Sequence, residues 1–428
     1  MNDTHSLSAI VMAAGQGTRM RSATPKHLHP LLGRRMVDWV LAAVEPLGPA
    51  PLVIVTSPET ADAFGDEGSA TIAVQQEPRG TGDAVTSARR ALGGDDADVL
   101  VLSGDTPLVT QELLRGLVDG HRSAGAHVTV LSFVLDEPGA YGRIVRDASG
   151  GLAAIVESQD ASPEELSLTE VNSSIYAFSA AALWGALDRI DPHNAQGELY
   201  LTDCVRHIVA GGGRGHVVVA PSRHEVLGVN TRVELAQAAA VLRDRINEQH
   251  MLAGVTIVDP HSTWIEAGVV LEADVTVHPF TVIRGDVTVR RGVEVGPFAY
   301  VRPGTEAGEE AKIGTFVEVK NSRIGARTKI PHLSYVGDAD IGEDTNVAAG
   351  NITANFPHEK GEGKQRTTIG RNVRTGVDNS FLAPVTIGDN AWVAAGSVIT
   401  EDVPPDALAI ARARQENKEG YAGGKRHD

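Results

Sequence analysis

The chain has 428 residues, of which 42% are hydrophobic and 22% charged, and this is long enough for two or three globular domains. Its formal net charge of −17 argues against a nucleic-acid partner, because no broad basic surface is available to neutralise phosphates. No run approaches the length of a membrane span, and residues 1–15 lack the basic head and long apolar core of a signal peptide. We therefore expect a cytoplasmic protein with no membrane partner. The single cysteine, Cys204, excludes an intrachain disulfide framework and a cysteine-rich metal site.

Short apolar runs alternate with amphipathic stretches over residues 7–228. The predicted strands are SAIVMAA (8–14), PLVIVTS (51–57), TIAVQQ (71–76), DVLVLSG (98–104) and HVTVLSFVL (127–135). Helical patterns such as MVDWVLAAVEPL (36–47) and DAVTSARRAL (83–92) lie between them. This alternation predicts a mostly parallel sheet with helices on both faces.

A long helix and a repeat array follow. Residues 231–250 are rich in good helix formers and free of Gly and Pro, which predicts a connector helix between domains. Aliphatic or small residues then recur every six positions from Ile265 to Val319. Their register slips by one before Ile324 and again before Ile341, and it resumes from Ile369 to Ile399. Hexapeptide repeats predict a parallel β-helix in which three hexads close one coil of eighteen residues. The segment between Thr353 and Thr368 breaks the pattern and predicts a polar loop that leaves the prism.

The stretch VMAAGQGTRM (11–20) follows the first predicted strand. It is not a dinucleotide-binding fingerprint, because the position of the third glycine is occupied by Met20. The stretch is expected to lead into a helix, whose N-terminus and preceding backbone amides would face an anion. Arg19 and Lys26 add positive charge near the same place. For an isolated loop, a tight glycine turn with solvated basic residues is an equal alternative.

Two further features favour a ligand site at this edge of the sheet. Asp105 lies at the carboxyl end of an apolar strand, where open α/β sheets bind ligands and where a carboxylate is well placed to hold a hard divalent cation. Gly80 and Thr81 follow another strand, where the backbone is able to approach a ring or a sugar closely. A surface-turn aspartate is the simpler alternative for Asp105.

The repeat region has its own candidate site. Arg302 and Lys320 each follow an interior aliphatic residue and are eighteen residues apart, so they are expected to stack on adjacent coils. Two cations so close repel each other unless an anion such as a sugar phosphate lies between them. His332 points away from the interior and is the best candidate for a base, with Glu318 as an orienting partner. A solvated charged edge and a solvated histidine are the alternatives.

Several motifs together carry a resemblance. They are AAGQGTRM, PKHLHPL, Q-x-x-x-x-GTG, SGDTPL, YGRIV, IVE, EVN and GVN, followed by coils with VRPG, FVEVKNS, PHLSYVGDADIG and a KEG tail. In this order they resemble the bifunctional N-acetylglucosamine-1-phosphate uridyltransferase/glucosamine-1-phosphate acetyltransferase family. The resemblance implies an α/β protein with a β-solenoid: a Rossmann-like nucleotidyltransferase domain (1–229), a connector helix (230–250), a left-handed parallel β-helix (251–408) and a tail (409–428).

The resemblance also implies two activities and their site residues. The first joins UTP to N-acetylglucosamine 1-phosphate, with Arg19 and Lys26 on the phosphates and Mg²⁺ held by Asp105 and Asn230. The remaining substrate-binding positions of this half would be Gly15, Gln75, Gly80, Thr81, Gly142, Glu157 and Asn172. The protein needs to form no covalent bond in a nucleotidyl transfer, because a metal ion and well-placed cations neutralise the charge that develops on the phosphates.

The second implied activity moves acetyl from acetyl-CoA to the amine of glucosamine 1-phosphate in a homotrimer. His332 would be the base, and the substrate-binding positions would be Arg302, Lys320, Tyr335, Asn346, Asn355, Ala395 and Arg412.

The chain departs from the family pattern at some positions. Phe356 stands where the family commonly has tyrosine and Val377 where a serine is expected, and the stretch 259–304 is about two coils shorter. A monofunctional sugar-1-phosphate nucleotidylyltransferase, with a β-helix used only for assembly, is therefore an alternative prediction.

Overall fold

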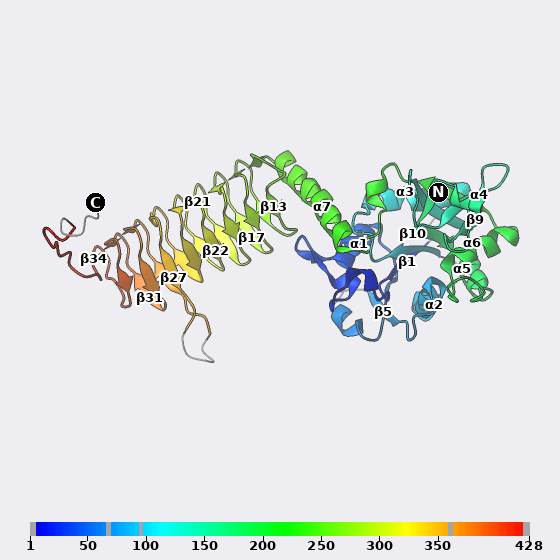
Figure 1. Ribbon diagram of the computed structural model, residues 1–428, viewed down its shortest axis with the longest axis horizontal. Helices are drawn as coiled ribbons and strands as arrows, with labels where there is room; N and C mark the ends of the chain where they lie inside the picture. The colour runs from blue at the N-terminus through cyan, green and yellow to red at the C-terminus, as the bar shows by residue number, and fades with distance from the viewer. Residues whose placement is uncertain (1–5, 66–69, 94–96, 358–362, 423–428) are drawn as a thin grey trace. The chain divides into compact units, whose positions relative to one another are not determined.

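The computed structural model describes residues 6–65, 70–93, 97–357 and 363–422. The chain divides into two compact units, residues 1–241 and 242–428 (Figure 1). In the part of the chain that the structure describes, no helix has the length and apolar composition needed to cross a membrane.

The first unit is built on one mixed sheet. Its strands are β1 (Leu7–Met12), β4 (Leu52–Thr56), β5 (Thr71–Val74), β6 (Asp98–Ser103), β7 (Val128–Val134), β8 (Arg143–Arg146), β9 (Leu152–Val156), β10 (Glu170–Ser179) and β11 (Gly215–Val219), with a separate pair β2 (Pro30–Leu31) and β3 (Arg34–Arg35). Its helices are α1 (Met36–Val44), α2 (Thr81–Leu92), α3 (Gln111–Ala124), α4 (Pro163–Leu166), α5 (Ala180–Leu187) and α6 (Leu201–Ala210). Single 3₁₀ turns are η1 (Thr18–Met20), η2 (Lys26–Leu28), η3 (Glu45–Leu47), η4 (Ala61–Phe64) and η5 (Arg223–Glu225).

The strand order is β11-β7-β10-β6-β1-β4-β5, with β8 and β9 attached beside β10. All five predicted strands are present. The strands β5, β4, β1 and β6 run parallel, as predicted, but β10 runs antiparallel to both of its neighbours, β6 and β7. The expectation of a mostly parallel sheet therefore holds for one half, whereas the half that contains β10 is mixed.

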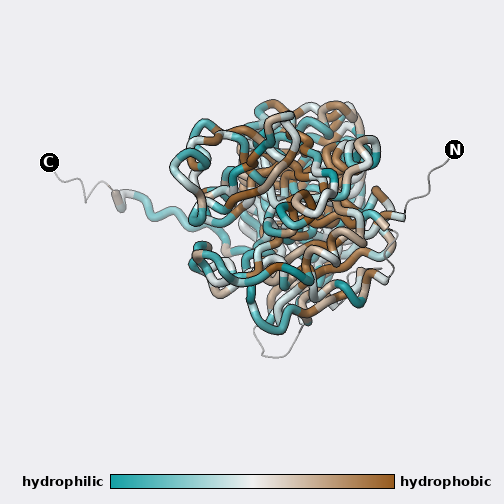
Figure 2. The backbone as a smooth tube through the Cα atoms, turned by 90° about the vertical axis from the view of Figure 1, so that its right-hand side faces the viewer, coloured by the Kyte–Doolittle hydropathy of each residue, from teal (hydrophilic) through white to brown (hydrophobic). Residues whose placement is uncertain are grey.

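Side-chain alternation along the strands builds a core on each face of the sheet. Ile10 and Met12 of β1 belong to one buried cluster, with residues of α2, α5 and α6, while Ala9 and Val11 point to the other, with residues of α1 and α3. A parallel sheet buried on both faces needs such continuous apolar strands. In Figure 2 the tail after β34 (Leu408–Ala409) is mostly hydrophilic.

The predicted connector is helix α7 (Arg232–Leu252). Thr231 and Glu234 form a reciprocal cap at its start: the Thr231 hydroxyl accepts from the amide of Glu234, and the Glu234 carboxylate accepts from the amide of Thr231. This arrangement satisfies amides that have no partner within the helix. The boundary between the two compact units falls within α7.

The second unit is a triangular prism of short parallel strands, as the hexads predict (Figure 1). The first face holds β12 (Thr256–Ile257), β15 (Thr276–Val277), β18 (Glu294–Val295), β21 (Lys312–Thr315), β24 (Lys329–His332), β29 (Arg374–Thr375), β32 (Trp392–Val393) and β34. The second face holds β13 (Trp264–Ile265), β16 (Val282–Ile283), β19 (Tyr300–Val301), β22 (Glu318–Lys320), β25 (Tyr335–Gly337), β27 (Ile352–Ala354), β30 (Ser380–Leu382) and β33 (Val398–Ile399). The third face holds β14 (Val270–Leu271), β17 (Val287–Val289), β20 (Thr305–Ala307), β23 (Arg323–Ile324), β26 (Ala339–Ile341), β28 (Thr367–Ile369) and β31 (Val385–Ile387).

The predicted interior positions fill the prism. Every one of them is buried, from Ile265 to Ile399, because each strand turns one side chain inward, and nearly all of these side chains are aliphatic. The two predicted slips in register are coils that are one residue shorter than the preceding ones. Ala307 pairs with Ile324, and Ile324 pairs with Ile341, so each of these coils has seventeen residues, whereas the coil before them has eighteen. The next coil carries the predicted loop, so that Ile341 pairs with Ile369. All three irregularities lie at the edge between the second and third faces, which we call the irregular edge (residues 320–323, 337–339 and 354–367).

The edge between the first and second faces is apolar over four coils. It consists of Phe280, Phe298, Phe316 and Leu333, which we call the apolar edge, and each of these side chains is about half exposed or more. The three rings stack, with centroids 4.8 and 5.1 Å apart. All four residues have a positive φ of 50–59°, a conformation that is costly for bulky side chains.

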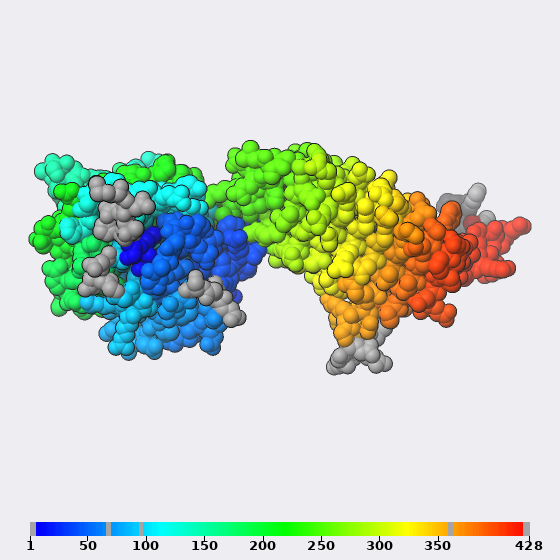
Figure 3. Space-filling model, turned by 180° about the vertical axis from the view of Figure 1, so that it is seen from behind, coloured from blue at the N-terminus to red at the C-terminus, as the bar shows by residue number. Residues whose placement is uncertain are grey.

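The polar loop leaves the side of the prism, as Figure 3 shows for its described residues. Positions 358–362 of this predicted loop lie outside the described residues. Arg366 anchors its returning end through an ion pair with Asp340 at 2.8 Å.

Candidate active sites

The stretch after β1 is a loop with one short turn. Only Thr18–Met20 form a 3₁₀ turn, and Gly17 before it and Arg21 after it have left-handed backbone conformations. The expectation of a helix at this position is wrong, because these conformations and Pro25 leave no room for α-helical hydrogen bonds. A side chain at Gly17 would collide with Lys26, so the glycine permits the loop to pack against that lysine.

Four predicted residues of the first unit meet in one polar cluster. The Lys26 ammonium forms an ion pair with Asp105 and donates to Asn230 Oδ1 at 3.0 Å. The Arg19 guanidinium donates to the same Asn230 oxygen at 2.9 Å. Burial would raise the pKa of Asp105, but Lys26, His27 and a hydrogen bond from Ser103 outweigh it and hold that pKa below its usual range.

The two oxygen-bearing residues of this cluster are held in place by their own surroundings. The Ser103 hydroxyl, at the end of β6, donates to Asp105 Oδ1 at 2.6 Å, and the amide of Val229 donates to the Asp105 carbonyl at 2.8 Å. The amide of Asn230 donates to Glu234 Oε2 at 2.8 Å, so the cap of α7 fixes Asn230 as well. Within the described ranges, no three His, Cys, Asp or Glu residues gather as a metal site. Oxygen-bearing groups beside Asp105 are the Ser103 hydroxyl, which donates to it, and the Asn230 amide, which shares its Lys26 partner.

A cavity of about 430 Å³ opens beside this cluster. Its lining includes Gly15, Lys26, Gln75, Gly80, Thr81 and Asp105. The Gln75 amide nitrogen donates to Gly80 O at 3.1 Å and to Asp83 Oδ2 at 2.9 Å, which leaves the Gln75 carbonyl oxygen for a ligand. Gly80 has a φ of 116°, and a side chain there would meet the backbone of Leu199 at 2.6 Å. The structure therefore brings together the predicted phosphate and base contacts.

The three predicted sugar contacts also meet. The amide of Asn172 donates to Gly142 O at 2.9 Å, and the Asn172 side chain is fixed by hydrogen bonds with Tyr176 and Ser174. A side chain at Gly142 would lie 3.4 Å from Glu157 Oε2. The absent side chain at Gly142 leaves space next to that carboxylate oxygen.

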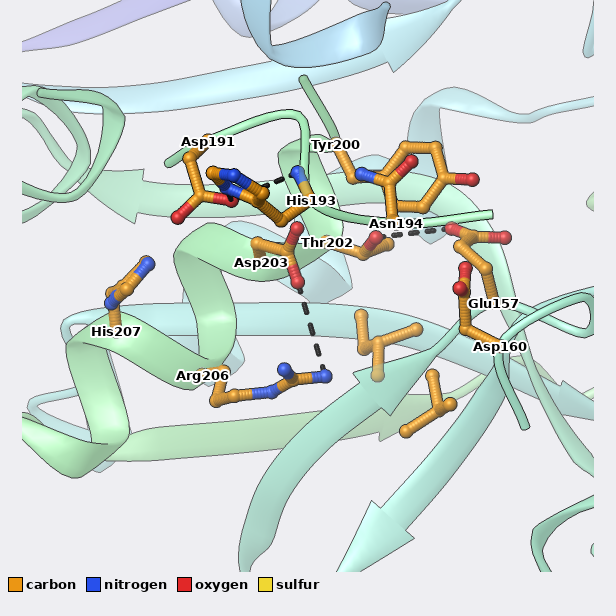
Figure 4. A pocket seen from close by; sticks show the side chains of 12 residues that line it. Glu157, Asp160, Asp191, His193, Asn194, Tyr200, Thr202, Asp203, Arg206 and His207 are labelled. Carbon is orange, nitrogen blue, oxygen red and sulfur yellow. Dashed lines mark hydrogen bonds and ion pairs between the residues drawn. The ribbon is translucent and has the colours of Figure 1, made fainter. Parts of the chain in front are cut away.

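Glu157 also borders a second cavity, of about 330 Å³ (Figure 4). Three other carboxylates line it, those of Asp160, Asp191 and Asp203. Burial is the main reason that the pKa of Glu157 lies above its usual range, and Asp160 and Asp203 raise it further. The Thr202 hydroxyl donates to Glu157 Oε1 at 3.0 Å and opposes this rise (dashed in Figure 4).

The predicted cation pair of the second unit lies on neighbouring coils. Val301 pairs with Val319, so Arg302 and Lys320 follow side by side, as their spacing predicts. Glu318 Oε1 accepts from Arg302 at 2.7 Å, so this carboxylate is engaged by Arg302, and its pairing with His332 stays a prediction. The nearby Lys364 is the main reason that the pKa of Lys320 lies below its usual range, and desolvation and the Arg302 charge lower it further.

Tyr335 and Asn355 lie next to this pair. The Asn355 amide donates to the Tyr335 hydroxyl at 3.4 Å and to the buried carboxylate of Asp338. The Tyr335 ring lies over Gly337, where a side chain would collide with it. Arg302, Lys320, Tyr335 and Asn355 thus gather on the second face and its irregular edge.

The other predicted acetyl-transfer residues lie elsewhere on the prism. The strand register aligns His332, Val377 and Ala395 in one column, where the first face meets the apolar edge. Arg412 lies beside this column, 3.9 Å from the position that a side chain at Gly396 would take. Asn346 is exposed on the first face, between Lys329 and Arg374. One prism therefore divides the predicted site between two faces.

Comparisons with known proteins decide the family. Residues 9–166 match the model described as MobA-like NTP transferase domain, and residues 366–401 match that described as hexapeptide repeat of succinyl-transferase. The bifunctional protein GlmU of Streptomyces coelicolor is 45% identical over 458 residues, which cover 98% of this chain and 94% of that protein. The bifunctional protein GlmU of Mycobacterium tuberculosis is 44% identical over 463 residues, with 98% and 92% covered. The chain belongs to the GlmU family.

Membership in the GlmU family identifies the chain as a bifunctional transferase, a nucleotidyltransferase and an acyltransferase, which makes UDP-N-acetylglucosamine. The alignment with the Streptomyces GlmU spans 458 residues although this chain has 428, so at least 30 aligned positions are gaps in this chain. This chain is therefore shorter than that GlmU over the aligned region, and the placement of the missing residues at 259–304 stays a prediction.

Sequence reasoning missed two residues that the structure brings to these sites. His27 is buried and lines the cavity of about 430 Å³, and its Nδ1 has no partner among the described residues. Burial, followed by the Lys26 charge, lowers the pKa of His27 to about 4, which keeps the ring neutral. Lys364 joins Arg302 and Lys320 from the polar loop. The adjacency of His27 to Lys26 was a possible signal, whereas Lys364 lies in a segment without any periodicity.

Proposed function

We propose that this GlmU-family chain catalyses two successive reactions. First, the amine of glucosamine 1-phosphate attacks the thioester carbonyl of acetyl-CoA, forming an amide bond and releasing coenzyme A as its thiol. Second, a phosphate oxygen of the resulting N-acetylglucosamine 1-phosphate attacks the α-phosphorus of UTP, and pyrophosphate leaves. The observation that carries the proposal is the cluster of Lys26, Asp105 and Asn230 beside a cavity of about 430 Å³.

We assign uridylyl transfer to residues 1–229 and acetyl transfer to residues 251–408, joined by the connector 230–250 and followed by the tail 409–428. The compact units with a boundary near residue 241 support a division in the connector. We further propose that the enzyme acts in the cytoplasm, where UTP and acetyl-CoA are made.

In the uridylyl step, this chain binds and orients both substrates. Arg19 and Lys26 neutralise charge on the phosphates, while the free carbonyl oxygen of Gln75 accepts from the N3–H of uracil. Cytosine has no hydrogen at that position, so this contact discriminates against it. Gly15, Gly80 and Thr81 line the same cavity. Gly142, Glu157 and Asn172 hold the sugar hydroxyls, which aligns the sugar phosphate for in-line attack.

The residues present fit a divalent cation. In the structure the Lys26 ammonium already lies between Asp105 and the Asn230 oxygen, so a positive charge is accommodated there. One carboxylate and one amide oxygen are hard donors, which suit Mg²⁺ together with substrate phosphates. When bound, Mg²⁺ would neutralise the charge that develops on the leaving pyrophosphate. We propose that Asp105 and Asn230 hold it.

In the acetyl step, Arg302 and Lys320 bind the sugar phosphate, and His332 accepts the proton that the attacking amine loses. Tyr335 and Asn355 hold the sugar and the acyl group, and Asn346, Ala395 and Arg412 contact the remainder of the two substrates. The mutual repulsion of Arg302, Lys320 and Lys364 supports an anion between them.

We propose a homotrimer in which neighbouring prisms complete each acetyl-transfer site. Two observations support it. His332 and Asn346 lie on or beside the first face, whereas the sugar-phosphate cations lie on the second face, so one prism does not present them together. The apolar edge next to His332 exposes three stacked phenylalanines, and such a surface is typical of an interface.

Replacing one residue of the apolar edge is expected to dissociate the trimer. The variant is Phe298→Asp, because aspartate is found with a similar positive φ at Asp378 on the same edge, so the backbone tolerates it. Light scattering should give three times the 45.0 kDa chain mass for the wild type and the single-chain mass for Phe298→Asp. Glu310→Asp, at the equivalent turn of another edge, is the matched control and should remain trimeric. A monomeric wild type at micromolar concentration contradicts the proposal.

A pair of assays tests the two activities. With UTP, Mg²⁺ and a panel of sugar 1-phosphates, pyrophosphate should be released with N-acetylglucosamine 1-phosphate, and a chelator should abolish this release. With acetyl-CoA and glucosamine 1-phosphate, free thiol should appear whether or not the chelator is present, because no metal is assigned to that step. Failure of wild type to release pyrophosphate with any sugar 1-phosphate rejects the first assignment, and absence of thiol release rejects the second.

A further inference from the structure

The two oxygens of Glu157 have different surroundings. Oε2 is the oxygen nearest to Gly142, on the side where the sugar is expected. Oε1 accepts from the hydroxyl of Thr202, whose side chain is buried in the first turn of α6. The hydroxyl therefore fixes one end of the carboxylate and leaves the other for a substrate hydroxyl, as Figure 4 lets the reader follow.

We propose that Thr202 is a positioning residue for sugar recognition, which orients the Glu157 carboxylate and keeps it ionised. The inference rests on the proposed role of Glu157 in binding N-acetylglucosamine 1-phosphate. Thr202 itself touches no reacting atom.

Several effects disfavour the ionised form of the Glu157 carboxylate, and the Thr202 hydrogen bond opposes them. Burial disfavours that form, and so do three neighbouring carboxylates, those of Asp160, Asp203 and Glu198. Tyr176 and Tyr200 also lie near it, and Glu157 helps to raise the pKa of both phenols, which stay neutral. A hydroxyl that donates to a carboxylate stabilises the charged form, and Thr202 supplies that bond. Without the bond, the pKa of Glu157 would rise further.

The residue before Thr202 gives the test its selectivity. The amide of Leu201 donates to the Thr81 hydroxyl at 3.0 Å, so the same turn of α6 also supports the nucleotide side through its backbone. A substitution that only removes the Thr202 hydroxyl leaves this backbone bond intact. A general disturbance of α6 would affect both substrates.

The test is Thr202→Val, which keeps the shape and removes the donor, measured by uridylyl-transfer kinetics at several pH values. The KM for N-acetylglucosamine 1-phosphate should rise about tenfold, as expected for loss of a bond to a charged group, while kcat and the KM for UTP stay within about twofold. As pH falls, protonation of Glu157 should raise the sugar KM, and in Thr202→Val this rise should begin at a higher pH. Thr202→Ser should restore wild-type values.

Two controls complete the design. Thr86→Val removes a hydroxyl that only bonds a backbone carbonyl within α2, at 2.8 Å, and should change neither KM. In a Glu157→Gln background, Thr202→Val should add little further loss, because its partner's charge is already gone. Thr202→Ala replaces Thr202→Val if the latter fails to fold.

An unchanged sugar KM, equal rises in both KM values, or a serine variant as impaired as valine overturns the inference. Wild type without uridylyl transfer overturns the proposed function instead.

Discussion

Asp105→Asn is expected to reduce uridylyl transfer at least ~100-fold in turnover, which corresponds to about 2.7 kcal/mol of lost transition-state stabilisation. The physical reason is that the substitution removes the only carboxylate of the Lys26–Asp105–Asn230 cluster, and with it the charge that would hold a divalent cation against the leaving pyrophosphate. The measurement is pyrophosphate release at saturating substrates over a series of Mg²⁺ concentrations.

A matched control lies on β6, the strand that precedes Asp105. Asp98, at the start of β6, is also buried and forms an ion pair with Arg122 at 2.7 Å, but it lies at the opposite end from Asp105. Asp98→Asn should therefore keep turnover within roughly threefold, because it disturbs a similar ion pair without touching the substrates. Acetyl transfer by Asp105→Asn should be unchanged. Near-normal turnover of Asp105→Asn in Mg²⁺ would remove Asp105 from the metal site.

His332→Ala is expected to abolish most acetyl transfer, by at least ~100-fold, while uridylyl transfer stays nearly intact. A general base that accepts the proton of the attacking amine contributes a factor of this size, and no other histidine occupies the column that His332 shares with Val377 and Ala395 in the described coils. Thiol release from acetyl-CoA and pyrophosphate release from UTP, measured on the same preparation, give the two rates.

The control is His278→Ala, because His278 lies on the same face of the prism but on an earlier coil. It should leave both rates unchanged. If His332→Ala transfers acetyl as fast as the wild type, the proposed base is wrong. If the wild type itself is inactive, Phe356→Tyr and Val377→Ser test whether these side chains, both exposed, silence the site.

The repeat array was predictable because each hexad is a local signal that is repeated many times. Ile265 and Val301 are buried for the same reason, and even the slips before Ile324 and Ile341 were visible as missing residues. The mixed half of the first sheet was not predictable in the same way, since the direction of β10 depends on which neighbours it meets after folding. A short run of apolar residues does not encode that choice.

In the candidate sites, too, local motifs were predictable and long-range contacts were not. Motifs predicted Asp105 and Lys26 as candidate site residues. Their ion pair was not predicted, because they are 79 positions apart in the sequence and only the folded sheet brings them together. No sequence motif indicated a role for Thr202, because its contact with Glu157 depends on how α6 packs against β9. The expected helix after the first strand is interrupted at Gly17 and Arg21, which have left-handed backbone conformations, and the close packing of Gly17 against Lys26 exists only in the folded chain.

The irregular edge of the β-helix has a consequence for how this repeat tolerates change. Two successive coils omit a residue there and the next one inserts a loop, and it is beside these three defects that Lys320, Asp338 and Asn355 lie. A consensus sequence that restored eighteen residues to every coil would make the solenoid more uniform, and uniform repeats are usually more stable. The same repair would shift Asp338 and Asn355 out of line with Lys320. At this edge, a uniform coil length would therefore favour stability, whereas the proposed acetyl-transfer site needs the shortened coils and the inserted loop. The chain retains these irregular coils where the substrate is expected to bind.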